Sequence, residues 1–184
     1  MRAAVVLTTA SALLLACSGA ESPHGLDSGG ELGLAGSGPV KNFVAPLRGE
    51  EEVPPVDTKG TGLAKFQLRE GSDELDYKLI AANIVGVTQA HIHCGSPGVN
   101  GPIVVFLFGF DPAGVAPHGI LAQGTITPGD VIPLPDSPEC PGGIANFEEL
   151  IERLQAGGAY ANVHTLVNPG GEIRGHIDHG NGVD

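Results

Sequence analysis

The chain has 184 residues with 9 basic and 21 acidic side chains, which gives a formal charge of −12 at pH 7. A surface this acidic repels nucleic acids and anionic lipids, so charge-driven binding to either of them is excluded. The length fits a single domain with short extensions.

Residues 1–16 have the features of a secretory signal. Arg2 is their only charged side chain, and a short apolar stretch follows it. This stretch is shorter than the roughly 20 residues that a membrane span needs. The run LLAC at 14–17 resembles the bacterial lipobox, in which the cysteine becomes the lipidated first residue. We therefore predict a lipoprotein signal with a lipid anchor on Cys17; an ordinary signal peptide with a chance cysteine is the alternative.

This prediction places the mature protein outside the cytoplasm, attached to a membrane. Ser18 stands where an aspartate usually marks retention in the inner membrane, so the outer membrane or the cell surface is favoured. Removal of residues 1–16 leaves 8 basic and 21 acidic side chains, a formal charge of −13. Residues 17–41 are rich in Gly and Ser and predict a flexible tether. A domain is then expected over 42–180, with a short tail at 181–184.

Within 42–180 the chain is a series of short apolar segments separated by Gly and Pro. Alternation of apolar and polar residues, as at 63–68 and 75–79, is typical of strands with one buried face. Short, evenly spaced strands predict an all-β antiparallel sandwich or barrel. The expected strands lie at 43–48, 63–68, 75–79, 87–93, 103–108, 120–126, 160–165 and 172–177.

One segment predicts a helix instead. Apolar side chains at 147, 150, 151 and 154 recur with helical period. Asn146 can cap its first turn, and Glu149 stands at the third helical position, as in a capping box. We expect a single short helix that packs on the β structure.

The cysteines agree with export. If lipid takes Cys17, Cys94 and Cys140 remain as a pair in an oxidising compartment, where a disulfide is the default. The alternative is that the Cys94 thiolate binds a metal beside His93.

Histidines in two expected strands are the candidates for chemistry. His91 and His93 are two residues apart, so alternation places both rings on the same face of their strand. His164 ends a later strand and can supply a third ring. Imidazole suits copper and zinc, so the three side chains are a candidate metal site. Two hydrogen-bonded structural histidines are the alternative explanation of the His-x-His pattern.

Several motifs in order resemble those of the CHRD domain, which occurs in chordin and in bacterial secreted proteins. They run over residues 43–178, nearly the whole expected domain. The motifs are EVPPV at 52–56, GTGLAKF at 60–66, AHIH at 90–93, GSPGVNGPIVV at 95–105, YANVHT at 160–165 and NPGGEIRG at 168–175.

The resemblance implies an immunoglobulin-like antiparallel Greek-key sandwich or barrel, similar to the copper/zinc superoxide dismutases. In that comparison, His91, His93 and His164 match copper ligands in order and type, and His176 is a possible fourth. The family usually has Gln at the position of His176, and residues 94–105 hold no His or Asp that could form a zinc loop. Copper is therefore the expected cofactor, and the alternatives are another transition metal or no cofactor.

Other charged groups receive structural interpretations. We expect Glu50, Glu51 and Glu52 to form a solvated acidic run and Arg174 to form a surface ion pair. His24, His118 and His179 are expected in the tether, a loop and the tail, exposed to solvent.

Two functions follow. The first is an anchored binding module that holds a protein partner, or a transition metal on surface strands without turnover. The second is a copper-dependent redox enzyme of dismutase type. The acidic charge disfavours the second, because an enzyme that attracts superoxide needs a positive potential at its site.

Overall fold

The computed structural model describes residues 41–180. The predicted signal peptide, the tail and all of the tether except Lys41 lie outside these residues, and so do Cys17 and His24. Within the described part of the chain, no helix is both long enough and apolar enough to cross a membrane.

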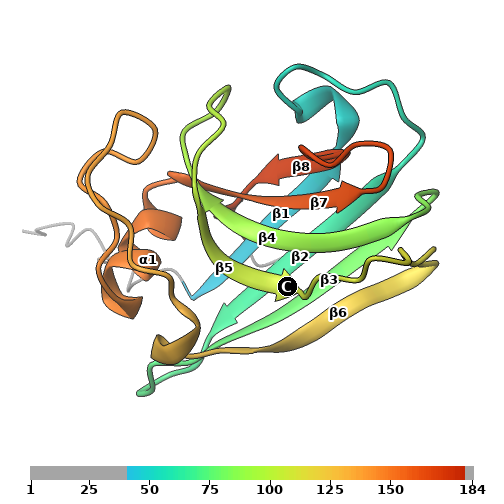
Figure 1. Ribbon diagram of the computed structural model, residues 1–184. Helices are drawn as coiled ribbons and strands as arrows, with labels where there is room; N and C mark the ends of the chain where they lie inside the picture. Colours follow the sequence, from blue (N-terminus) through green and yellow to red (C-terminus); the bar gives the residue numbers. More distant parts are fainter. Residues whose placement is uncertain (1–40, 181–184) are drawn as a thin grey trace, which may run out of the picture. The chain divides into compact units, whose positions relative to one another are not determined.

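Across residues 41–180, nine antiparallel strands form one sheet, in the order β5-β4-β7-β8-β1-β2-β3-β6 with β9 paired to β1. The sheet curls into a nearly closed barrel (Figure 1). This confirms the prediction of an all-β antiparallel fold. The strands are β1 (Asn42–Arg48), β2 (Thr61–Leu68), β3 (Leu75–Ala82), β4 (Val87–Cys94), β5 (Ile103–Phe108), β6 (Gly119–Ile126), β7 (Ala159–Thr165), β8 (Ile173–His176) and β9 (Asp178–His179).

Alternation along the strands builds the core. In β1, for example, Phe43, Ala45 and Leu47 are buried, and in β2 Ala64 and Phe66 are buried opposite them. The side chains between these positions point to the outer face of the barrel.

The predicted helix is α1 (Phe147–Gln155), and it lies at one end of the barrel (Figure 1). Its four predicted apolar positions are buried in the same core. Asn146 caps it, because its side-chain oxygen accepts from the Glu149 N–H at 3.0 Å. In a capping box, the side chain at the third helical position accepts from the N–H of the N-cap residue, which here is Asn146. Glu149 instead accepts from the N–H of Ala145, one residue earlier. The loops of the described domain also contain the single-turn helices η1 (Gly49–Glu51) and η2 (Pro128–Asp130).

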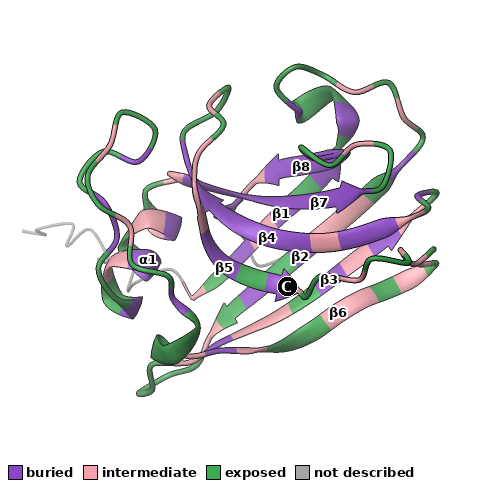
Figure 2. Cartoon of the chain, in the orientation of Figure 1, coloured by how far each residue is buried: buried purple, intermediate pink, exposed green. Residues whose placement is uncertain are grey.

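Strands β4 and β7 are buried on both faces along nearly their whole length, and the short strand β8 beside them is buried in the same way (Figure 2). The inward residues of β4, Ala90, Ile92 and Cys94, belong to the core. Its outward residues His91 and His93 are covered by loops instead of by water. A polar site is thereby enclosed between the sheet and its loops.

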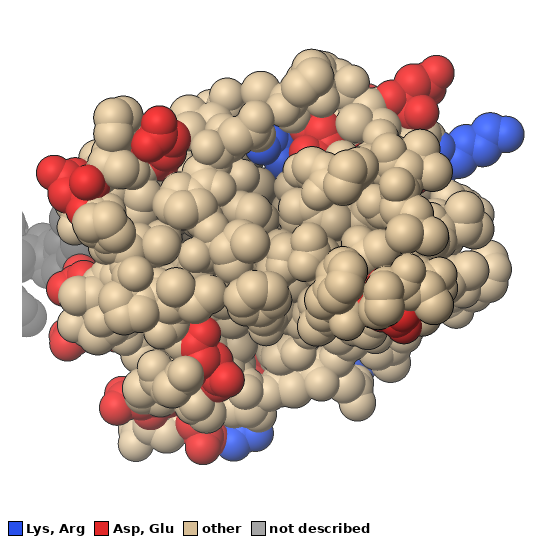
Figure 3. Space-filling view, viewed as in Figure 1, with Lys and Arg blue, Asp and Glu red and all other residues tan. Residues whose placement is uncertain are grey.

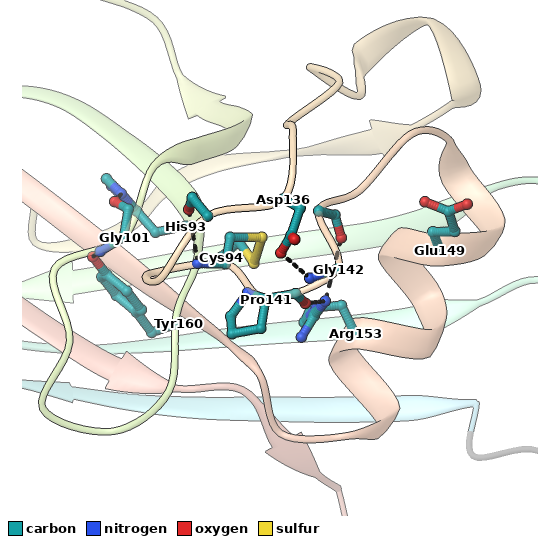
Figure 4. Close-up of a disulfide and its surroundings, with 12 residues drawn as sticks. His93, Cys94, Gly101, Asp136, Pro141, Gly142, Glu149, Arg153 and Tyr160 are labelled. Carbon is teal, nitrogen blue, oxygen red and sulfur yellow. Dashed lines mark hydrogen bonds between the residues drawn. A yellow bond between two sulfur atoms is a disulfide. The ribbon is translucent and has the colours of Figure 1, made fainter.

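Cys94 and Cys140 form a disulfide with an S–S distance of 2.05 Å, as predicted (Figure 4). Both residues are fully buried. Because the sulfur of Cys94 is bonded to Cys140, it is not a metal ligand in this structure. The bond ties the end of β4 to the loop that precedes α1.

The disulfide closes a loop across a sequence separation of 46 residues. On the chain-entropy model, such a loop contributes about 4 kcal/mol to the free energy of unfolding. We predict that the double variant Cys94→Ala/Cys140→Ala loses a few kcal/mol in chemical denaturation. Reductant should lower the stability of the natural protein to that of the variant and leave the variant unchanged. Equal stability of the two proteins under oxidising conditions would contradict the prediction.

Candidate metal centre

The three predicted histidines come from adjacent strands and share the outer face of the sheet. His91 pairs with Asn162 across the β4–β7 ladder, and Gln89 pairs with His164. His164 is therefore the diagonal neighbour of His91, a spacing that long side chains can bridge. The β4–β5 register shifts just before His91 and again just before His93. Such bulges change the direction of side chains, often next to functional sites.

The rings converge closely. One ring nitrogen from each of the three histidines lies within 4.8 Å of the others. Nδ1 of His91 and Nε2 of His164 are 3.0 Å apart. With metal–nitrogen bonds of about 2.0–2.1 Å, two nitrogens on one ion lie at most about 4.2 Å apart. The 4.8 Å bound exceeds this limit by about 0.6 Å, so small shifts of the rings would let the three nitrogens hold one metal ion.

Backbone carbonyls orient two of the three rings. Nδ1–H of His93 donates to the Gly101 carbonyl oxygen at 2.9 Å, and Nδ1–H of His164 donates to the Pro169 oxygen at 3.0 Å. Each bond leaves a lone pair on Nε2. Metal-bound histidines typically donate their second ring N–H in this way. Two of the rings thus already have the tautomer that a metal needs.

Gly101 is central to this orientation (Figure 4). Its carbonyl accepts from His93, and its N–H donates to the Tyr160 hydroxyl at 3.1 Å. The Tyr160 ring stacks on the His93 ring, with centroids 4.9 Å apart and planes at 9°. A Cβ on Gly101 would lie 1.6 Å from the Cys94 carbonyl oxygen, so only glycine can occupy this position. Nothing in the sequence pattern predicts that Tyr160 belongs to the site.

The expectation that the histidines lie on a surface strand is wrong. His91 is 0% exposed, His164 5% and His93 7%. They point away from the core, as alternation predicts, but loops cover them. Phe106, which is 51% exposed, packs edge-on against His91 at a centroid distance of 4.7 Å. In Figure 3 most charged groups lie around the margins of this face of the molecule.

Burial changes the ionisation of the rings. Loss of hydration lowers the pKa of His91 to about 3 and that of His93 to about 4. The neighbouring His164 and His93 lower the pKa of His91 further. Burial also lowers the pKa of His164. All three rings are therefore neutral at pH 7, which is the form that binds metals.

A second buried polar group lies beside the histidines, and here two expectations are wrong. Glu52 is 4% exposed and Arg174 is 2% exposed, so neither belongs to a solvated run or a surface ion pair. Their closest charged atoms, Arg174 Nε and Glu52 Oε2, are 3.8 Å apart. Arg174 also donates to the Glu51 and Asn100 oxygens and lies over the Tyr160 ring. Burial raises the pKa of Glu52 to about 7 although Arg174 opposes this.

This face also has polar atoms without partners. Within the described residues, six buried side-chain nitrogen or oxygen atoms have no hydrogen-bond partner, and all belong to the outward-facing polar group around the histidines. They are Glu52 Oε1, His91 Nε2, His93 Nε2, Asn162 Oδ1, Arg174 Nη2 and His176 Nδ1. Buried polar atoms are normally paired, so their concentration here indicates a place for a bound ion or water.

The other histidines of the described part are not among the three whose ring nitrogens converge. His176 is half-buried, with its ring 5.8 Å from that of Tyr160, and it is not among the residues whose ring nitrogens converge. His118 and His179 are exposed, as expected, but His179 lies in β9 and not in the tail.

Comparison with known families matches residues 43–177 to the CHRD domain. No curated protein matches the chain.

The lowered pKa values predict how the metal-free protein responds to acid. Unfolded histidine titrates near pH 6.5, whereas His91 and His93 titrate near 3 and 4 in the fold. Their contribution to the free energy of unfolding is therefore complete above pH 6.5 and is lost as the pH falls from 6.5 towards 4. Each pKa unit corresponds to about 1.4 kcal/mol. We predict that His93→Gln loses less unfolding free energy over this range than the natural protein, measured by urea denaturation.

His118→Gln, at an exposed loop position, is the matched control and should follow the natural protein. Glu52 changes the pH dependence of stability in the opposite direction. Because its pKa is raised, its contribution to the free energy of unfolding is largest below pH 4.5 and becomes smaller as the pH rises through 7. Glu52 is present in the natural protein and in both variants, so comparing their curves removes its effect. Parallel curves for His93→Gln and the natural protein would show that His93 is not held neutral by the fold.

Proposed function

The chain belongs to the CHRD domain family, and on this premise we propose that it is a membrane-anchored extracytoplasmic binding module that holds a transition metal. The observation that carries the proposal is the convergence of His91, His93 and His164 within 4.8 Å. The carbonyl-bound tautomers of His93 and His164 support it, since the lone pairs lie on the nitrogens that face away from these bonds.

The donors favour particular metals. Three neutral imidazoles without a carboxylate suit copper and zinc better than calcium or magnesium, which prefer oxygen ligands. Among divalent first-row ions, affinity is generally highest for Cu²⁺. We therefore propose copper as the preferred ion. When bound, copper would supply redox chemistry, while the protein residues bind it and exclude water.

A redox enzyme is the competing candidate, because three protein ligands leave a coordination position open for a substrate. Two observations favour a binding module instead. The histidines are buried, and Phe106 covers His91. The negative charge of the chain also repels an anionic substrate such as superoxide. Loss of superoxide at a rate proportional to bound copper would reverse this preference.

The proposed location rests on two features. The LLAC run at 14–17 resembles a lipobox, and the Cys94–Cys140 disulfide suits an oxidising compartment. The tether predicted at 17–41 would connect the domain to its lipid.

An unknown protein is a second partner that the module could bind.

The metal proposal is tested by titrating metal-free protein with Cu²⁺ in a calorimeter. We predict one ion per chain for the natural protein. The triple variant His91→Ala/His93→Ala/His164→Ala should lose more than the roughly 10–100-fold in affinity that removal of an outer-shell partner costs. His118→Ala controls for nonspecific binding to histidine and should bind normally. If the folded triple variant binds Cu²⁺ as tightly as the natural protein, the site is elsewhere.

The anchor proposal is tested by fractionating cells that express the full chain. Cys17→Ala should prevent lipidation and move the protein from the membrane to the soluble fraction. Ser18→Ala keeps the cysteine and should remain in the membrane fraction. Retention of Cys17→Ala through its N-terminus would refute the lipobox interpretation.

A further inference from the structure

His91 differs from the other two histidines because no backbone carbonyl holds its ring. Its Nδ1 lies 3.0 Å from Nε2 of His164. Nδ1–H of His164 donates to Pro169, so the Nε2 of His164 can only accept. Nδ1 of His91 must therefore carry the proton in this hydrogen bond. The buried Nε2 of His91 then carries a lone pair, and this nitrogen has no hydrogen-bond partner.

This tautomer is incompatible with a metal ion held between the two closest nitrogens. An ion bound by Nδ1 of His91 and Nε2 of His164 needs a lone pair on both atoms. The proton must leave Nδ1 of His91. A neutral imidazole can carry it on Nε2 instead, so one N–H bond breaks and another forms, with no change in the charge of the ring.

The new Nε2–H of His91 would be buried and would need an acceptor. Asn162 is the direct cross-strand partner of His91, and its buried Oδ1 has no donor. Oε1 of Glu52 is the other buried side-chain oxygen without a hydrogen-bond partner in the described part of the chain. A Cβ on Gly171 would lie 2.7 Å from both of these oxygens, so they face the same small space. The glycine leaves that space open.

From this arrangement we propose that metal binding moves the proton of His91 from Nδ1 to Nε2, and that Asn162 and Glu52 accept it there, directly or through one water. Asn162 and Glu52 are then positioning residues that act on the metal through His91. Arg174 keeps the Glu52 carboxylate in place from its other side, with Nε 3.8 Å from Oε2. This inference rests on the proposed function of the three-histidine site.

The direct test is nitrogen-15 NMR of the histidine rings in the full domain, before and after addition of Zn²⁺, which is diamagnetic. Long-range proton–nitrogen correlations distinguish a protonated from an unprotonated ring nitrogen. We expect His91 to carry its proton on Nδ1 without metal and on Nε2 with Zn²⁺. His93 and His164 should keep theirs on Nδ1 throughout. A His91 ring that retains Nδ1–H with Zn²⁺ bound would overturn the inference.

Variants separate positioning from folding. Asn162→Ala removes the acceptor and should weaken Zn²⁺ binding about 10–100-fold, the usual effect of losing an outer-shell partner. Asn162→Asp keeps an oxygen at the same place and should restore most of the affinity. Glu52→Gln should lose a smaller factor because its amide oxygen still accepts, and Glu51→Gln, at an exposed neighbouring carboxylate, should change nothing. Unaltered affinity in folded Asn162→Ala would contradict the positioning role.

The two proposals fail in different ways. If the natural protein binds no Zn²⁺ or Cu²⁺, both fall. If it binds through the three histidines while His91 keeps Nδ1–H, the binding function stands and only the proton transfer is wrong.

Discussion

The whole site depends on the burial of both faces of β4 and β7. Alternation sends Ala90, Ile92, Ala161 and Val163 into the barrel and leaves polar side chains on the opposite face. A sheet face covered by loops excludes water from those side chains, which makes each missing hydrogen bond costly, by about 1–3 kcal/mol. The lowered pKa values of the three imidazoles follow from this enclosure, whereas their close approach follows from the register of β4 and β7.

Local patterns in the sequence were sufficient for most of the fold. Period-2 alternation identified the long strands, helical period and Asn146 identified α1, and cysteine counting identified the disulfide. The histidine triad also follows from local information, because His-x-His fixes one face and β7 supplies the third ring. Their convergence required knowing that β4 and β7 are neighbours, which the family resemblance suggested.

The rest of the site comes from contacts between residues distant in sequence, which local patterns do not report. Glu52 looks like the end of an acidic run, yet it meets Arg174, over 120 residues later, under a loop. Tyr160 looks like an ordinary strand aromatic, and only the fold reveals that it stacks on His93. Unpaired atoms such as Asn162 Oδ1 are likewise visible only once the partners of every buried group are known.

Gly101 has a consequence for how such chains diverge. Its Cβ-free backbone passes so close to the Cys94 carbonyl that no other residue fits, and the same backbone sets the tautomer of His93. A descendant that keeps all three histidines but replaces this glycine would have to rebuild the loop and would release the His93 ring. In related sequences the glycine should therefore be lost together with the histidines or retained with them, so that its substitution alone marks a lineage in which the site has begun to decay.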